Sequence, residues 1–221
     1  HDMEFVMDLA DPMVVLDGSH NPGAMETLTT LVERYEVTLV HAGSLAVRGV
    51  ALPAVVLVGG AIMGSALAWN LAVSPHFNGS VLVVERDPRY ADCSTAHTNS
   101  CIRQQFGNAL NIRLSQYTAE VLRDFPAYMG DDARVPHQQI QSFGYLYLAG
   151  DEAGAARLRH AHAVQLDCGV PARLMTPEEI AACYPFYALD DVVLGSHNTR
   201  DEGYWDGGSV FEWFRRKARE K

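Results

Sequence analysis

A glycine-rich turn in the sequence "VVLVGGAIMGSALAWNLA", residues 55–72, is the first place where this chain could do chemistry. Four branched apolar residues lead into the turn Gly59, Gly60, Ala61, Ile62, Met63 and Gly64. Between a strand and a helix, such a turn presents backbone N–H groups to a pyrophosphate. Its first glycine makes the bend and its third lets helix and strand pack closely, but Ala61 stands at the second, phosphate-facing place. The pattern predicts a pyrophosphate-binding turn that the Ala61 methyl group weakens.

An acidic residue follows at the distance that a dinucleotide site requires. Glu85 ends the apolar run "SVLVVE", where its carboxylate can accept hydrogen bonds from an adenosine ribose. A carboxylate at this position repels a 2′-phosphate, so NADP is disfavoured. Glycine turn and acid together leave FAD and NAD open as ligands, with a turn that binds nothing as the alternative.

The elements that must position these residues form a β-α-β pattern. Apolar periodicity predicts a strand over 55–58, a helix over 62–73 and a strand ending at Glu85. Further along, helical spacing or alternation predicts the elements 111–125 (helix), 141–150 (strand), 152–168 (helix), 176–185 (short helix), 190–198 (strand) and 209–221 (helix). Gly169 is expected to end the helix before it, and Thr176 with Glu179 is expected to form a capping box.

Composition excludes several classes of partner. The net charge of −10 is opposite to that of proteins that bind a nucleic-acid backbone. No apolar run approaches the roughly 20 residues of a membrane span, and the acidic opening "HDMEFVMDLADP" has no signal-peptide pattern. We therefore expect no nucleic acid, no membrane span and a cytoplasmic location. The four cysteines show no C-x-x-C spacing, so no metal site is predicted.

Five segments, in this order, resemble the FAD-dependent D-amino-acid oxidase superfamily, which includes sarcosine and dimethylglycine oxidoreductases. They are "VVLVGGAIMGSALAWNLA", "VLVVERDPRYADCSTAHTNSCIRQQFGNALNIRLSQ", "GYLYLA", "LMTPEEI" and "DEGYWDGGSV", and the resemblance covers about residues 53–221. It implies an α/β fold: an incomplete FAD-binding Rossmann-like βαβ unit at 51–126, and the first part of an α+β substrate domain at 127–221. The last helix would connect back to the FAD domain.

The same resemblance implies roles for individual residues. Glu85 would bind the adenosine ribose, with Arg86 beside it at the adenine end. Ser94 and Thr95 would lie in the loop that runs past the phosphates and the flavin. Some relatives attach FAD covalently through a histidine in the segment that here contains His97. Arg103 would lie at the flavin and substrate face, where a cation favours a substrate carboxylate or the reduced, anionic flavin. A structural ion pair is the alternative for Arg103.

The implied enzyme is an FAD-dependent oxidoreductase that oxidises a C–N bond of a secondary amine or amino acid by hydride transfer to the flavin. Its partner would be a small amine or amino-acid substrate, and the sequence leaves the oligomeric state open. Relatives continue well past the point where this sequence ends, so the first alternative is a truncated, non-catalytic or assembly-factor-like flavin-fold protein. An NAD-dependent dehydrogenase is the second, which the loop after Glu85 disfavours.

Residues 1–50 are expected to form a small βαβ-like appendage. The stretch "VVLDGSHNPGAMETLTTLVE" resembles the turn that opens the C-terminal domain of folylpolyglutamate synthases and Mur-type ligases. That resemblance would place Asp17, His20 and Asn21 near a nucleotide. However, no Walker phosphate loop accompanies them, so ATP-dependent ligation is not expected.

Overall fold

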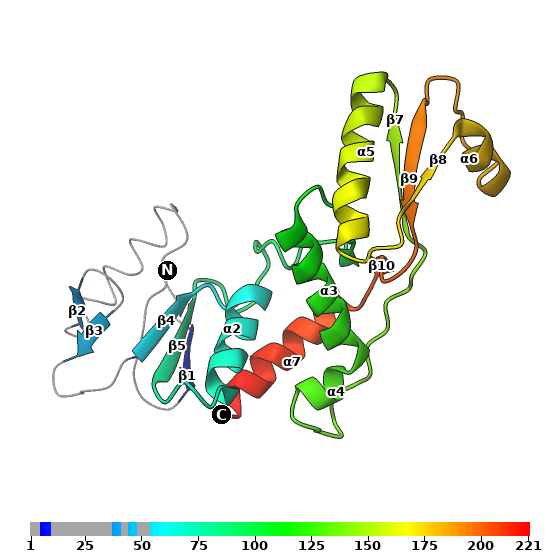
Figure 1. The fold of residues 1–221 in the computed structure, drawn as a ribbon. Helices are drawn as coiled ribbons and strands as arrows, with labels where there is room; N and C mark the ends of the chain where they lie inside the picture. The colour runs from blue at the N-terminus through cyan, green and yellow to red at the C-terminus, as the bar shows by residue number, and fades with distance from the viewer. Residues whose placement is uncertain (1–4, 10–36, 41–43, 48–53) are drawn as a thin grey trace. The chain divides into compact units, whose positions relative to one another are not determined.

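The computed structural model describes the backbone of residues 5–9, 37–40, 44–47 and 54–221 (Figure 1). Asp17, His20 and Asn21, the strand predicted before them and the helix predicted after them lie outside these residues. The chain divides into two compact units, residues 1–98 with 207–221 and residues 99–206, called unit 1 and unit 2 below.

Unit 1 contains the glycine turn. Its elements are β1 (Phe5–Leu9), β2 (Val37–Val40), β3 (Ser44–Val47), β4 (Ala54–Val58), α2 (Ile62–Val73), β5 (Ser80–Glu85) and α7 (Gly207–Arg219). Strands β4 and β5 pair in parallel, with Val56 opposite Leu82. Strand β1 adds to the other side of β5 in the antiparallel direction, which gives the order β1-β5-β4, while β2 and β3 form an antiparallel pair of their own.

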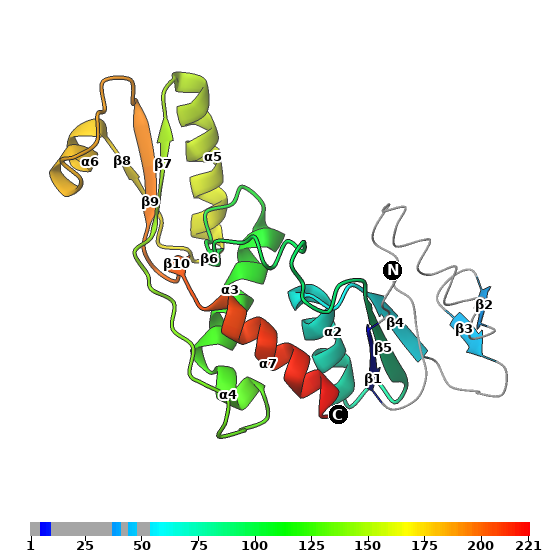
Figure 2. The same cartoon turned by 180° about the vertical axis from the view of Figure 1, so that it is seen from behind.

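The central strands and helices of unit 1 follow from their apolar patterns. Val56 and Val83 are completely buried, as expected for parallel strands covered by helices. Helices α2 and α7 lie side by side in both Figure 1 and Figure 2. Helix α7 buries Val210, Phe214 and Ala218, which recur every four residues on one face.

Unit 2 carries the second group of elements. They are β6 (Cys101–Ile102), α3 (Ala109–Arg123), α4 (Phe125–Tyr128), β7 (Tyr145–Ala149), α5 (Glu152–Asp167), β8 (Arg173–Met175), α6 (Pro177–Cys183), β9 (Leu194–Asn198) and β10 (Gly203–Tyr204). An antiparallel sheet has the order β7-β9-β8, and β10 pairs antiparallel with β6.

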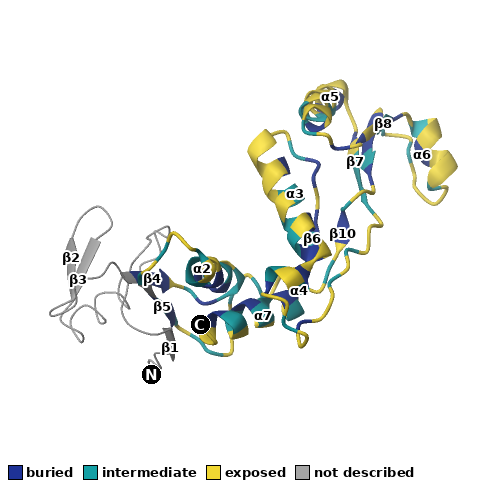
Figure 3. Cartoon of the chain, turned by 60° about the horizontal axis from the view of Figure 1, so that its bottom comes forward, coloured by how far each residue is buried: buried dark blue, intermediate teal, exposed yellow. Residues whose placement is uncertain are grey.

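The two faces of the larger sheet in unit 2 are covered by different helices. Leu194 packs with Ala149 of β7 and Ala155 of α5. The next residue along β9 is Gly195, and a Cβ there would lie 2.7 Å from Cδ1 of Ile180 in α6. Since successive strand residues point to opposite faces, α5 and α6 cover opposite faces of this sheet. Figure 3 shows buried strands here and a largely exposed outer side of α3.

The element predictions hold where the pattern is local. Helix α2 has the predicted bounds, Gly169 follows α5 with φ +77°, and Thr176 and Glu179 form the capping box. The patterns did not predict the short strands β6, β8 and β10, which depend on partners far along the chain. The two compact units are groups of residues in mutual contact, and such groups need not coincide with domains. The domain boundaries proposed at residues 50 and 126 therefore stay predictions.

The described residues contain neither a membrane-spanning helix nor a cluster of metal-ligating side chains. None of the helices placed by the structure is both long and apolar enough to cross a bilayer. Within the same described ranges, no three His, Cys, Asp or Glu side chains are grouped as a metal site would require.

Candidate functional site

The glycine turn joins β4 to α2 and needs glycine at two of its positions. Gly59 has φ +99°, a conformation that L side chains rarely adopt, and its N–H donates to the Val84 carbonyl at 2.7 Å. A Cβ at Gly64 would lie 1.9 Å from the Gly59 carbonyl oxygen. Helix and strand therefore approach each other as closely as the predicted third glycine implies.

The N-terminus of α2 presents backbone donors without a side-chain cap. Ala61 is the N-cap residue, and its methyl group cannot accept a hydrogen bond from the first turn of α2. Its φ of −66° is ordinary for alanine, so the methyl group costs no backbone strain. Ser65 Oγ donates to the Gly60 carbonyl at 2.6 Å and fixes the turn from inside. Apart from the Ile62 N–H, which donates to Thr95, the first turn has the donors and the partial positive charge that a phosphate requires.

Glu85 lies directly against the glycine turn. Its Oε2 accepts a hydrogen bond from the Gly60 N–H at 2.8 Å, and its Oε1 accepts one from the Asp87 N–H at 2.9 Å. The two features that the sequence singled out for a dinucleotide thus meet at one end of the β4-β5 pair. The carboxylate keeps unused lone pairs, which could accept from ribose hydroxyls.

The loop after β5 reaches back to the turn through one of its predicted residues. Thr95 Oγ1 accepts a hydrogen bond from the Ile62 N–H at 3.3 Å. Arg86, Ser94 and His97 are exposed, so their roles at the cofactor stay predictions. Met63 is 81% exposed and points away from the core of unit 1.

Arg103 belongs to unit 2 and lies over aromatic rings. Its guanidinium carbon is 4.7 Å from the Phe106 ring centroid and 5.9 Å from that of Tyr147. The side chain is exposed, and no described carboxylate forms an ion pair with it. The aromatic support leaves its N–H donors available to an anion. The role of Arg103 at the flavin and substrate face therefore stays a prediction.

Two tyrosines neighbour Arg103 on β7. The rings of Tyr145 and Tyr147 stack with centroids 6.2 Å apart. Burial, with Cys101 as a second cause, raises the pKa of Tyr145 to about 12. Burial also raises the pKa of Tyr147, against the opposing effect of Arg103. Both hydroxyls stay protonated at neutral pH, so they can donate hydrogen bonds.

In the sequence "DEG" after β9, Glu202 is a buried structural residue. The side chain of Glu202 is completely buried. Its Oε1 accepts from the backbone N–H groups of Gln104 and Gln105 at 2.6 and 3.0 Å, and its Oε2 accepts from Gln105 Nε2 at 2.9 Å. Glu202 thereby holds the segment that carries Arg103. The two glutamines were missed from sequence, although their place next to Arg103 in "IRQQFG" was a usable signal.

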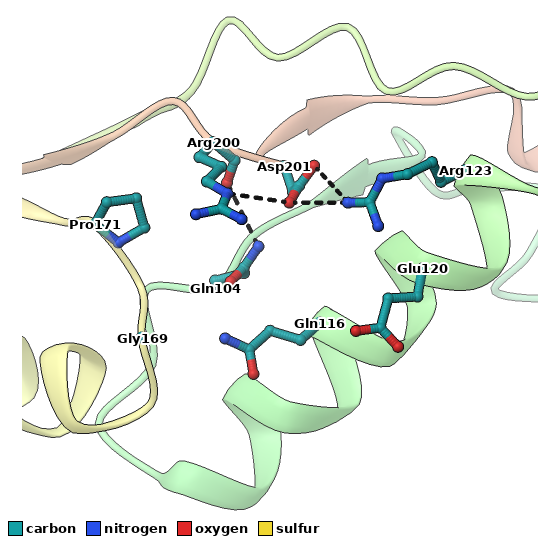
Figure 4. Close-up of a pocket in the computed structure, with 8 residues that line it drawn as sticks. All are labelled: Gln104, Gln116, Glu120, Arg123, Gly169, Pro171, Arg200 and Asp201. Atoms are coloured by element: carbon teal, nitrogen blue, oxygen red, sulfur yellow. Dashed lines mark hydrogen bonds and ion pairs between the residues drawn. The ribbon is translucent and has the colours of Figure 1, made fainter.

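A polar pocket of about 260 Å³ lies elsewhere in unit 2 (Figure 4). Asp201, which has φ +53°, pairs with Arg123 at 3.3 Å and with Arg200 at 3.9 Å. Gln104 Nε2 donates to the Arg200 carbonyl at 3.4 Å. The lining is Gln104, Gln116, Glu120, Arg123, Gly169, Pro171, Arg200 and Asp201. Because Asp201 and Glu120 together balance the two arginines, the pocket has no surplus charge for an ionic ligand.

Comparisons with known proteins agree with this geometry. The family described as "FAD dependent oxidoreductase" (DAO) matches residues 54–221. The FAD-dependent oxidoreductase domain-containing protein 1 of Xenopus laevis is 37% identical over 168 residues, which are 74% of this chain and 33% of that protein. Its Bos taurus counterpart is 36% identical over 74% of this chain and 34% of its own length. The chain spans about a third of these curated relatives.

Solved structures of the same superfamily share the fold. L-proline dehydrogenase from P. horikoshii has a TM-score of 0.58 and 27% identity, with 75% of this chain and 41% of that chain covered. Glycine oxidase from Bacillus cereus has a TM-score of 0.54 at 16% identity, covers 74% of this chain and 42% of its own, and shows the fold alone. The predicted Rossmann-like fold and the choice of FAD over NAD are confirmed. This chain belongs to the family of FAD-dependent oxidoreductases of the DAO type.

Proposed function

We propose that unit 1 binds the adenosine end of FAD and that the complete protein oxidises a C–N bond of a secondary amine or amino acid. The observation that carries the proposal is the cluster of Gly59, Gly64 and Glu85. It combines a turn that needs glycine at two positions, a helix N-terminus whose N-cap residue makes no side-chain bond, and a carboxylate bonded to the turn. These residues fit a dinucleotide, because phosphate needs the N–H groups and ribose needs the carboxylate.

Different residues of the chain would bind the pyrophosphate, the ribose and the substrate. Backbone N–H groups at the start of α2 would bind the pyrophosphate, and Glu85 would bind the ribose. Arg103, held over Phe106 and Tyr147, would orient a substrate carboxylate or favour the anionic reduced flavin. Bound FAD supplies the hydride acceptor for the carbon next to the amine nitrogen.

The names of similar proteins support an amine or amino-acid substrate for the complete protein. The solved relatives include a proline dehydrogenase and a glycine oxidase, and both are named for a small amino acid. An exposed cation beside two protonated tyrosine hydroxyls has the chemistry to recognise such a carboxylate.

Flavin binding by the purified chain tests the first half of the proposal. After gel filtration with FAD, we expect an absorption band near ~450 nm to travel with the protein. A colourless protein overturns the proposal for this chain, and retention of NADH without flavin would favour the dehydrogenase alternative. Anaerobic addition of proline, sarcosine or glycine then tests the second half, since a substrate should bleach that band.

A further inference from the structure

Tyr90 lies beside the glycine turn in unit 1 in an unusual conformation. Its φ is +58°, a region that bulky residues seldom adopt, and its side chain is 6% exposed. A backbone held in this way costs free energy and persists only where the surrounding packing imposes it. Residues of this kind concentrate at sites with a function.

Helix α7 holds the Tyr90 ring in place. The ring meets Phe211 edge to face, with centroids 4.9 Å apart. The Arg215 guanidinium lies over both rings, 5.4 Å from the Tyr90 centroid and 5.8 Å from that of Phe211, and it is paired with Glu212. These contacts with α7 hold the Tyr90 ring and thereby fix the position of its hydroxyl.

No described residue accepts a hydrogen bond from the fully buried hydroxyl, since the nearby Arg215 guanidinium can only donate to its oxygen. A Cβ built on Gly60 would lie 3.0 Å from this hydroxyl oxygen and 3.4 Å from Glu85 Cβ. Tyr90, Gly60 and Glu85 thus converge on one point. Burial, the larger effect, raises the pKa of Tyr90 against the opposing influence of Arg215. The hydroxyl therefore remains a donor at neutral pH.

A structural role alone does not account for this hydroxyl. A phenylalanine would make the same ring contacts without burying an unpaired polar group, whose desolvation is unfavourable. The Glu85 carboxylate acts electrostatically on this hydroxyl, and at present it accepts from Gly60 and Asp87. Ribose hydroxyls that bind this carboxylate would compete with the Gly60 N–H for its lone pairs.

We propose that Tyr90 is a positioning residue of the FAD site, whose hydroxyl donates to Glu85 when the ribose draws that carboxylate away from Gly60. The proposal rests on the proposed function, since it takes FAD as the ligand of Glu85. It makes Tyr90 a donor that is unpaired in the free chain and paired in the complex. Helix α7, through Phe211 and Arg215, would then contribute to cofactor affinity without touching the cofactor.

The substitution Tyr90→Phe separates this role from a structural one. We expect the affinity for FAD, measured by quenching of flavin fluorescence, to fall on the order of tenfold, the effect of one hydrogen bond to a charged group. The melting temperature without FAD should stay the same or rise, because an unpaired buried hydroxyl is removed. Tyr187→Phe, on an exposed ring of unit 2, is the matched control and should change neither value.

A double-mutant cycle tests whether Tyr90 acts through Glu85. In a Glu85→Gln background, which weakens the acceptor, Tyr90→Phe should cost clearly less FAD affinity than in the wild-type chain. An equal loss in both backgrounds, or an unchanged affinity in Tyr90→Phe, would overturn the inference while leaving the proposed function intact. A wild-type chain that binds no FAD would overturn both.

Discussion

The carboxylate of Glu85 accepts a hydrogen bond from the backbone N–H of Gly60 at 2.8 Å. This contact joins the end of β5 to the turn between β4 and α2. The carboxylate predicted to bind ribose and the turn predicted to bind phosphate therefore lie next to each other. Because Glu85 also accepts from Asp87, this second contact would still orient its side chain if a ligand displaced the Gly60 N–H. Such preorganisation reduces the entropy cost of binding.

Ala61→Gly should tighten FAD binding by about 1 kcal/mol, the size of one modest contact. The methyl group lies at the N-cap of α2, and glycine is also a better N-cap residue than alanine. Titration of flavin fluorescence measures the change. Ala66→Gly, within the same helix, is the control: it should lower helix stability without raising the affinity. Unchanged or weaker binding in Ala61→Gly would show that the methyl group does not obstruct the phosphate.

Gly64→Ala should destabilise unit 1 by more than ~2 kcal/mol and abolish FAD binding, because the added Cβ would lie 1.9 Å from the Gly59 carbonyl oxygen. The backbone of the turn would have to move. Chemical denaturation followed by circular dichroism gives the free energy of unfolding. Gly107→Ala is the comparison, since its added Cβ has no neighbour closer than 3.8 Å. Equal stability of the two variants would contradict the close packing at Gly64.

Glu202→Gln should destabilise unit 2 by ~2–4 kcal/mol, because a buried network loses its charge and one of its two acceptor oxygens and gains an unmatched amide donor. The carboxylate accepts from three N–H groups of Gln104 and Gln105. Glu120→Gln, on an exposed position of α3, should have little effect. Thermal unfolding measures both. If Glu202→Gln proves as stable as the control, the network is not what holds the Arg103 segment.

The stability of unit 2 should depend on the protonation of His197. Burial, and then the nearby Arg173, lowers the pKa of His197, whose Nε2 is 2.8 Å from the Tyr184 hydroxyl. The unfolded chain therefore binds this proton more readily than the folded chain. The stabilisation is present above the ordinary histidine pKa of about 6.5 and is lost as the pH falls towards the lowered value.

Melting curves between about pH 7.5 and pH 5 test this dependence. The melting temperature of the wild-type chain should fall with pH more steeply than that of His197→Gln. His160→Gln, at an exposed position of α5, should keep the wild-type slope. Parallel curves for wild type and His197→Gln would rule out His197 as the group responsible.

The sequence by itself determined the parts of this protein that depend on neighbouring residues. Helix α2 has its predicted bounds because apolar spacing and the flanking turn are local signals. The capping box of Thr176 and Glu179 spans only three residues, so its hydrogen bonds follow from the sequence pattern. The glycine turn and the acid at Glu85 were likewise readable, because a dinucleotide requires those residue types at those strand ends.

Only the tertiary structure decided which distant residues meet. Glu202 finds Gln104 almost a hundred positions earlier in the chain, and β10 pairs with β6 across a similar distance. Tyr90 reaches Gly60 and Phe211 only because β5 and α7 fold onto the same unit. No periodicity encodes such contacts, since they arise from packing between elements rather than from spacing within one. The sequence therefore indicated the turn that we propose as the ligand site, and the fold added the residues that support it.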